Sequence, residues 1–188
     1  MKARESGMPE EEMWKQFFDV EKILSELEVD NKTEKLVDLG SGYGTFTIPA
    51  GRKIKGKVYA YDIEDGLIKE LESKLKINNT ANVILFNKDF INEGTGLQDE
   101  EVDYVMLFNI LHAEKSADIL NEAFRILRRG GKAGVIHWNY DPSTPRGPSM
   151  SIRPRPEELK DMLAKAGFTI LKYNINLPPY HYGILAQK

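Results

Sequence analysis

The chain has 188 residues, 41% of them hydrophobic and 29% charged, which predicts a single domain over residues 1–188 with enough apolar material for a core. It has no cysteine and three scattered histidines, so disulfides and cysteine nucleophiles are excluded and no metal site is expected. The formal net charge of −3 disfavours nucleic acid as a partner. Apolar runs are too short for a membrane helix or a signal peptide, and we expect a cytoplasmic protein with no membrane span.

The N-terminal part of the chain carries apolar residues at helical spacing. Five of them recur at intervals of four, three, four and three residues: Met13, Phe17, Val20, Leu24 and Leu27. Such spacing places them on one face of a helix. A proline and three glutamates at positions 9–12 are typical of a first helical turn. The pattern predicts one amphipathic helix over about residues 9–28, packed on the core.

From residue 36 to about 167, short apolar runs alternate with helical patterns. This alternation predicts β-α-β units on a parallel sheet that is buried on both faces. The predicted strands are 36–39, 58–62, 83–86, 102–108 and 132–138. The predicted helices are 45–53, 66–77, 117–127 and 156–166, the third ending before two glycines and the fourth before one.

The C-terminal tail departs from this alternation. Runs 168–175 and 182–186 are strand-like, and the connection between them is too short for a crossover helix, so the last strand is predicted to be antiparallel. Segment 139–155 has four prolines and three arginines and follows the end of a predicted strand. Because open α/β sheets bind ligands at that edge, we expect this segment to face a substrate.

A glycine-rich segment, DLGSGYGTF over residues 38–46, joins the first predicted strand to the first predicted helix of the sheet. Its glycines let the backbone turn sharply and approach a ligand. No lysine followed by serine or threonine comes after the last glycine, which excludes the phosphate loop of nucleotide triphosphatases. Asp62 ends the second predicted strand 22 residues after Gly40, where such folds place an acid that binds ribose, so a nucleoside ligand is implied.

With Asp38 and its three glycines, this segment resembles the first motif of the class I S-adenosylmethionine-dependent methyltransferases. The resemblance covers most of the chain, since Asp62 matches the family's second-strand acid, NKDF at 87–90 its adenine-side acid, and LFNILH at 107–112 its fourth-strand motif. It implies a Rossmann-like three-layer α/β sandwich with a seven-stranded, mostly parallel sheet whose last strand is antiparallel. It also implies S-adenosyl-L-methionine as the cofactor of a methyl-transferring enzyme.

The resemblance further implies roles for individual residues. These are Asp38 at the methionine amino group, Gly40, Ser41, Gly42 and Gly44 against the amino-acid part, Asp62 on the ribose, Asp89 at the adenine amino group, Phe90 and Ile63 beside the adenine ring, and Asn109 facing the transferred methyl. Carboxylates accept hydrogen bonds from hydroxyls and amines, and apolar side chains cover ring faces, so each role suits its side chain. In the family an N-terminal segment often covers the cofactor, and we expect the helix at 9–28 to pack on or cap that site.

The end of the fourth predicted strand bears on the methyl acceptor. Its sequence departs from the family's amino-methylating motif of Asn or Asp, two prolines and an aromatic residue, and the lack of cysteine argues against arsenite methylation. The chain is thus similar to the small-molecule branch, which includes quinone-biosynthesis methyltransferases. Histidine is the natural base near neutral pH for an acceptor that loses a proton. We predict His112 for that role, with His137 as a second candidate and His181 as a third.

Three alternatives stay open on the sequence alone. A nicotinamide-dependent oxidoreductase would share the glycine loop and Asp62, but the chain has no tyrosine and lysine at the YxxxK spacing. A noncatalytic cofactor-binding module that activates a partner would bind S-adenosylmethionine without turnover. An RNA methyltransferase is disfavoured by the net charge. The sequence does not specify the acceptor, the atom that is methylated or the oligomeric state.

Overall fold

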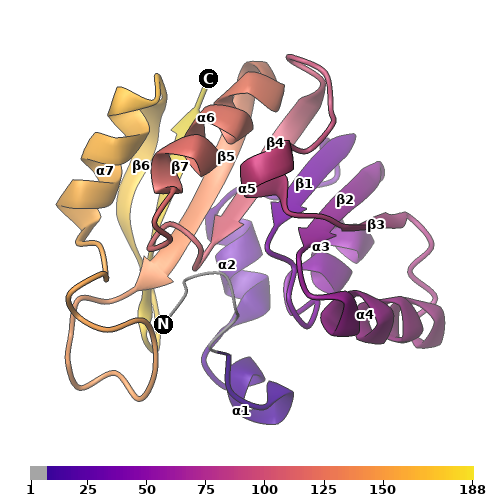
Figure 1. Cartoon of the computed structure of the whole chain (residues 1–188), viewed down its shortest axis with the longest axis horizontal. Coiled ribbons are helices and arrows are strands. Elements are labelled where there is room, and N and C mark those ends of the chain that lie inside the picture. Colours follow the sequence, from indigo (N-terminus) through magenta and orange to yellow (C-terminus); the bar gives the residue numbers. More distant parts are fainter. Residues whose placement is uncertain (1–7) are drawn as a thin grey trace.

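A seven-stranded sheet forms the centre of the structure, a computed structural model that describes residues 8–188 (Figure 1). The strands are β1 (Lys35–Leu39), β2 (Lys57–Asp62), β3 (Val83–Asn87), β4 (Val102–Phe108), β5 (Leu127–Trp138), β6 (Thr169–Leu177) and β7 (His181–Gln187). Their order across the sheet is β3-β2-β1-β4-β5-β7-β6. Strand β7 runs antiparallel to both of its neighbours, and the other strands share one direction. The predicted seven-stranded fold is confirmed.

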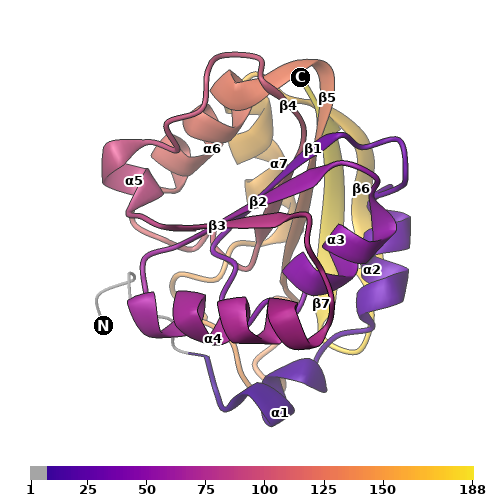
Figure 2. The ribbon, with the colours of Figure 1, turned by 90° about the vertical axis from the view of Figure 1, so that its right-hand side faces the viewer.

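Helices cover both faces of the sheet and complete three layers (Figure 2). They are α1 (Glu11–Lys15), α2 (Val20–Glu26), α3 (Thr47–Lys53), α4 (Asp65–Ile77), α5 (Phe90–Glu93), α6 (Ser116–Ile126) and α7 (Pro156–Lys165). Helices α2 and α3 lie on one face, α5, α6 and α7 lie on the other, and α4 packs along β2 and β3 (Figure 2). Each helix within residues 8–188 is too short or too polar to span a membrane.

Successive residues of the central strands belong to two separate hydrophobic cores, one on each face of the sheet. Val105 and Val135 belong to the core beneath α6 and α7, whereas Met106 and Ile136 belong to the core beneath α2 and α3. All four side chains are 0% exposed. A parallel strand covered on both faces reads as a continuous apolar run, which is why these strands could be predicted from the sequence.

The N-terminal segment differs from the single helix predicted over residues 9–28. The structure has two short helices, α1 and α2, separated by a four-residue break. Phe17 and Phe18 in this break are both buried, and Phe18 forms an isolated β-bridge with Pro179. Asp19 then caps α2, its side chain accepting a backbone N–H three residues on at 3.1 Å. The prediction of one helix is wrong because burying two adjacent phenylalanines turns the chain out of helical geometry.

Strand β5 also differs, because it begins at Leu127 instead of residue 132. Leu127 pairs with Val102 of β4, and the register then shifts across a bulge between Val102 and Tyr104. The two glycines that were predicted to follow a helix end therefore lie inside the strand. This early pairing ends α6 one residue sooner than predicted, at Ile126.

Candidate active site

The parallel strands end at one edge of the sheet, where the loops after β1, β2, β4 and β5 meet. Figure 1 shows α1 and the long loop after β5 at this same end. Segment 139–155 has no helix or strand, as predicted. Because ligands of open α/β sheets bind at the carboxyl ends of the strands, this edge is the candidate site.

The glycine-rich loop between β1 and α3 is left-handed at its three glycines, with φ of 82° at Gly40, 51° at Gly42 and 79° at Gly44. L side chains rarely adopt such values. A Cβ on Gly40 would stand 2.9 Å from Ile110 Cγ2, and a Cβ on Gly44 would collide with Leu71. The loop therefore needs glycine at both of these positions, and Gly40 lies directly against the loop that follows β4.

Asp62, the last residue of β2, holds the glycine loop with its side chain. Its Oδ2 accepts the Gly42 backbone N–H at 2.8 Å, and its Oδ1 accepts the Glu64 N–H at 3.0 Å. Burial raises the pKa of Asp62, while these backbone amides oppose the rise. Each carboxylate oxygen has a further lone pair, so Asp62 can accept a ligand hydroxyl and hold the loop at the same time.

Asp38 lies in β1 and is only 3% exposed. Its Oδ2 accepts a hydrogen bond from Thr47 Oγ1, at the start of α3, at 2.6 Å. Burial raises the pKa of Asp38 to about 7; the Thr47 hydrogen bond opposes this rise, and the charge of Asp62 adds to it. A cation beside this carboxyl would favour its ionised form and restore an ordinary pKa.

The segment after β3 carries the residues predicted for the adenine side. Asp89 caps the short helix α5, accepting the Asn92 backbone N–H at 3.3 Å and the Asn92 side-chain amide at 2.6 Å. Phe90 is buried and meets Tyr61 edge-on with ring centroids 6.5 Å apart. Ile63 is 42% exposed. Of the two apolar residues predicted beside an adenine ring, Ile63 is the one whose side chain reaches the surface.

His112 and His137 lie together at the ends of β4 and β5, with ring centroids 5.5 Å apart and ring planes at 80°. His137 is 0% exposed. Among residues 8–188, neither ring nitrogen of His137 nor Nδ1 of His112 has a hydrogen-bond partner. Burial lowers the pKa of both rings, and the charge of Arg153 lowers it further. Both imidazoles are therefore neutral at physiological pH.

The third histidine, His181, begins β7 and also reaches this edge. Its ring contacts the rings of Phe18 and Trp138, and its Nε2 lies 3.5 Å from Asn109 Nδ2 at the end of β4. The structure thus brings His181 to the end of β4, as its predicted position suggested. Its contact with Asn109 joins residues 72 positions apart, and no local sequence pattern marks it.

Arg153 organises the loop that follows β5. The residue is 6% exposed, and its guanidinium donates at 2.6 to 3.2 Å to the backbone oxygens of Asn139, Asp141, Arg146 and Pro148 and to Thr144 Oγ1. Arg153 is already engaged within the loop, so it acts on the site through its charge and through the shape of the loop.

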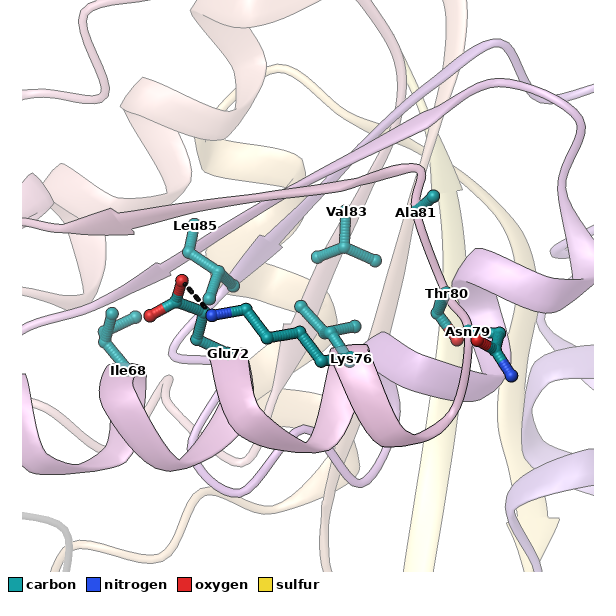
Figure 3. Close-up of a pocket in the computed structure, with 9 residues that line it drawn as sticks. Ile68, Glu72, Lys76, Asn79, Thr80, Ala81, Val83 and Leu85 are labelled. Atoms are coloured by element: carbon teal, nitrogen blue, oxygen red, sulfur yellow. Dashed lines mark hydrogen bonds and ion pairs between the residues drawn. The ribbon is translucent and has the colours of Figure 1, made fainter.

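A groove of about 810 Å³ lies apart from this site, between α4 and β3 (Figure 3). Its lining includes Ile68, Val83 and Leu85, with an ion pair of 2.9 Å between Glu72 and Lys76. It contains none of the predicted site residues. Within the described part of the chain, no three histidine or acidic side chains gather closely enough to hold a metal ion.

Comparison with known families and structures agrees with the geometry of this edge. A family model described as "Methyltransferase domain" matches residues 36–131, which is just over half of the chain. This match includes the glycine loop, Asp62, Asp89 and Asn109. The crystal structure of a SAM-dependent methyltransferase from Aquifex aeolicus superimposes with a TM-score of 0.81 at 22% identity, over 91% of this chain and 90% of that one. At such identity the likeness shows the fold.

The curated proteins that match this chain are distant from it in sequence and are longer than it. A ribosomal protein L11 methyltransferase from Limosilactobacillus fermentum is 32% identical over 111 residues, which is 57% of this chain and 33% of that protein. A tRNA(Phe) (4-demethylwyosine(37)-C(7)) aminocarboxypropyltransferase from Methanocaldococcus jannaschii is 30% identical over 148 residues, 78% of this chain and 54% of that protein. The chain therefore spans a third to a half of the length of these relatives. By its family match, the chain belongs to the methyltransferase-domain family, and it shares its fold with a solved SAM-dependent methyltransferase.

Proposed function

We propose that this chain is an S-adenosylmethionine-dependent methyltransferase that acts on a small-molecule acceptor bound at the ends of β4 and β5. The observation that carries the proposal is the burial of polar groups there, since His137 is 0% exposed and both of its ring nitrogens are without a partner among residues 8–188. A ligand that reaches these atoms must be enclosed beneath the loop 139–155, and small molecules are bound in this enclosed way. The net charge of −3 gives RNA no general electrostatic attraction.

The residues of the glycine loop fit S-adenosylmethionine. Ser41 Oγ and Thr45 Oγ1 are buried and, within the described chain, have no hydrogen-bond partner. Buried polar atoms without partners are costly, and a ligand with polar groups removes that cost. Asp38 would hold the amino group of the methionine part, and Asp62 would hold the ribose hydroxyls. We further assign the adenine side to Asp89 and Ile63.

His112 would act as the general base of the transfer. When bound, S-adenosylmethionine supplies a methyl group on a positively charged sulfur, which keeps the bonding electron pair as the acceptor's lone pair takes the methyl. His112 would receive the proton that the acceptor loses, since its neutral ring has an unpartnered Nδ1. His137 packs against this ring and would fix its orientation. Alignment of the two reactants supplies most of the remaining rate enhancement.

We expect Asp62→Ala to weaken binding of S-adenosylhomocysteine, the demethylated product, by about 1.5–3 kcal/mol, the range for a hydrogen bond to a charged group. The change removes both the acceptor for ribose hydroxyls and the contact with Gly42. Calorimetric titration measures the affinity, and a thermal melt reports whether the variant is folded. Asp65→Ala is the matched control, because Asp65 is exposed and its carboxylate pairs with Lys69. Unchanged affinity in Asp62→Ala would limit Asp62 to its role in the turn.

The N-terminal segment lies over the glycine loop, and we propose that it caps the cofactor. A Cβ on Gly42 would stand 2.9 Å from Met8 Cε, and Tyr43 Oη donates to the Pro9 carbonyl at 3.3 Å. Helix α1 is held by an ion pair of 2.7 Å between Glu11 and Lys74 of α4. Opening this segment would break the ion pair and expose the loop.

Glu11→Gln is therefore expected to speed dissociation of S-adenosylhomocysteine two- to fivefold, as suits the loss of one partly exposed ion pair. Stopped-flow displacement followed by the fluorescence of Trp14, which lies in α1, measures the rate. The control is Glu12→Gln, which removes the same charge from a residue that pairs with Lys15 of its own helix. Equal rates in the two variants would mean that α1 does not gate release.

Transfer from doubly labelled S-adenosylmethionine tests the proposed function. Tritium marks the methyl group and carbon-14 marks the carboxyl of the methionine part, and the acceptors are phenols, quinols, amines, thiols, ribosomal protein L11 and bulk tRNA. We expect tritium alone to reach a small molecule. Tritium on L11 or tRNA and on no small molecule would overturn the proposal. Transfer of carbon-14 would indicate aminocarboxypropyl transfer instead.

A further inference from the structure

His181 is fixed more tightly than a surface histidine on a strand end would be. Its ring is 0% exposed and lies 4.5 Å from the Phe18 ring and 4.4 Å from the Trp138 ring, centroid to centroid. Phe18 is itself fixed by its bridge to Pro179, just before β7. Two segments that are distant in sequence, at Phe18 and Trp138, thus hold one imidazole in place, which leaves it little freedom to rotate.

The fixed imidazole meets the side chain of Asn109. Nε2 of His181 lies 3.5 Å from Nδ2 of Asn109, so the amide can donate to the ring. Asn109 Oδ1 is buried and, in the described part of the chain, has no partner. Asn109 also has a φ of 56°, a left-handed value that asparagine and glycine tolerate, and its N–H donates to the Ile136 carbonyl at 3.0 Å. The backbone is therefore anchored while one side-chain oxygen is left without a partner.

Asn109 directly precedes a residue that packs on the cofactor loop. Ile110, which follows Asn109, packs so closely on Gly40 that a Cβ there would stand 2.9 Å from its Cγ2. A ligand on the glycine loop consequently has the end of β4 beside it. A buried amide oxygen can only accept a hydrogen bond, and leaving it without a donor is costly.

We propose that His181 is a positioning residue that holds the Asn109 amide with Oδ1 toward the methyl acceptor, so that the acceptor is one whose reacting atom carries an N–H or O–H. This inference rests on the proposed function and specifies its substrate class as amines or hydroxyl compounds. An acceptor that arrives as a carbanion or a deprotonated oxygen offers no hydrogen to Oδ1 and is disfavoured.

The protonation of His181 is consistent with this role. Burial lowers its pKa to about 3, against the opposing effect of the Phe17 backbone carbonyl, and Arg153 lowers the pKa further. The ring is thus neutral at any working pH. When the neutral imidazole accepts at Nε2, its proton is on Nδ1. Nε2 then has no hydrogen to donate to Oδ1 of Asn109, so the amide keeps Nδ2 toward the ring.

Sinefungin, a cofactor analogue with an amine-bearing carbon in place of the methylsulfonium, tests the inference without a known acceptor. Its amine donates hydrogen bonds where the acceptor would approach, and S-adenosylhomocysteine has no such group. We expect Asn109→Gly, which keeps the left-handed backbone unstrained, to lower the ratio of sinefungin to S-adenosylhomocysteine affinity by tenfold or more. His181→Phe should lower this ratio about fivefold, and the double variant should match Asn109→Gly. Affinity for S-adenosylhomocysteine should stay within about threefold throughout.

A further variant tests whether His181 acts by holding the Asn109 amide or only by filling space in the core. His181→Gln, which can accept from the Asn109 amide, should recover most of the affinity ratio, and His181→Met replaces His181→Phe if the latter does not fold. The inference is overturned if the nitrogen-free variants keep the wild-type ratio, or if Asn109→Gly does. If the wild-type protein fails to bind S-adenosylhomocysteine, the proposed function itself is overturned.

Discussion

Affinity for S-adenosylhomocysteine is expected to rise about tenfold per pH unit from pH 5 to about pH 7 and then to level off. Asp38 has a pKa of about 7 in the free protein because it is buried, so it is mostly protonated below that pH. The amino group of the ligand is a cation and favours the ionised carboxylate, so binding must release a proton. Calorimetry in buffers of different ionisation enthalpy measures this proton release directly.

Asp38→Asn should abolish this pH dependence and lower the affinity at pH 8 by about 10- to 100-fold, because the amide can still accept from Thr47 but has no charge. A wild-type affinity that falls as the pH rises would contradict the role of Asp38 at the amino group. The same holds if Asp38→Asn keeps the wild-type dependence of affinity on pH.

Asp38→Asn lowers the affinity for the ligand, but it should raise the stability of the folded protein at neutral pH relative to wild type. Because the folded state raises the pKa of Asp38 from 3.8 to about 7, the folded state binds the proton more tightly than the unfolded chain does. The contribution of this carboxyl to stability is therefore present below about pH 4 and is lost as the pH rises to about 7, by about 4 kcal/mol at most. Asp38→Asn has no carboxyl to titrate and does not undergo this loss. In denaturant titrations, its free energy of unfolding relative to that of wild type should therefore increase from pH 5 to pH 8.

His112→Ala should lower the rate of methyl transfer by about 10² to 10⁴-fold with an acceptor that must lose a proton, while cofactor affinity changes by less than about threefold. Burial lowers the pKa of His112, so the wild-type rate should fall in acid only at a pH below the ordinary pKa of histidine. Single-turnover kinetics with the acceptor found in the labelling experiment give both quantities.

His137→Phe is the matched comparison, because it keeps a ring against His112 and removes both nitrogens. We expect a smaller loss from this variant. A large loss in His137→Phe with His112→Ala near wild type would transfer the role of base to His137. Full activity in both variants would mean that alignment alone suffices, as for an acceptor that reacts without losing a proton.

Local patterns predicted the sheet and the strand ends at which the expected cofactor residues stand. The strands are buried on both faces and read as apolar runs, and Asp38, the glycines and Asp62 stand at strand ends that the sequence marks. The N-terminal helix was predicted wrongly because its break depends on Phe18 pairing with Pro179, far along the chain. The contact of His181 with Asn109 and the role of Arg153 likewise depend on tertiary register, which spacing in the sequence does not encode.

Calorimetric titration of the purified protein with S-adenosylmethionine, S-adenosylhomocysteine, NAD and NADP tests the central claim most directly. The account predicts that the first two ligands bind one to one and raise the melting temperature by mass action, and that the nicotinamide cofactors do neither. Binding and stabilisation by NAD, with no response to S-adenosylmethionine, would contradict it.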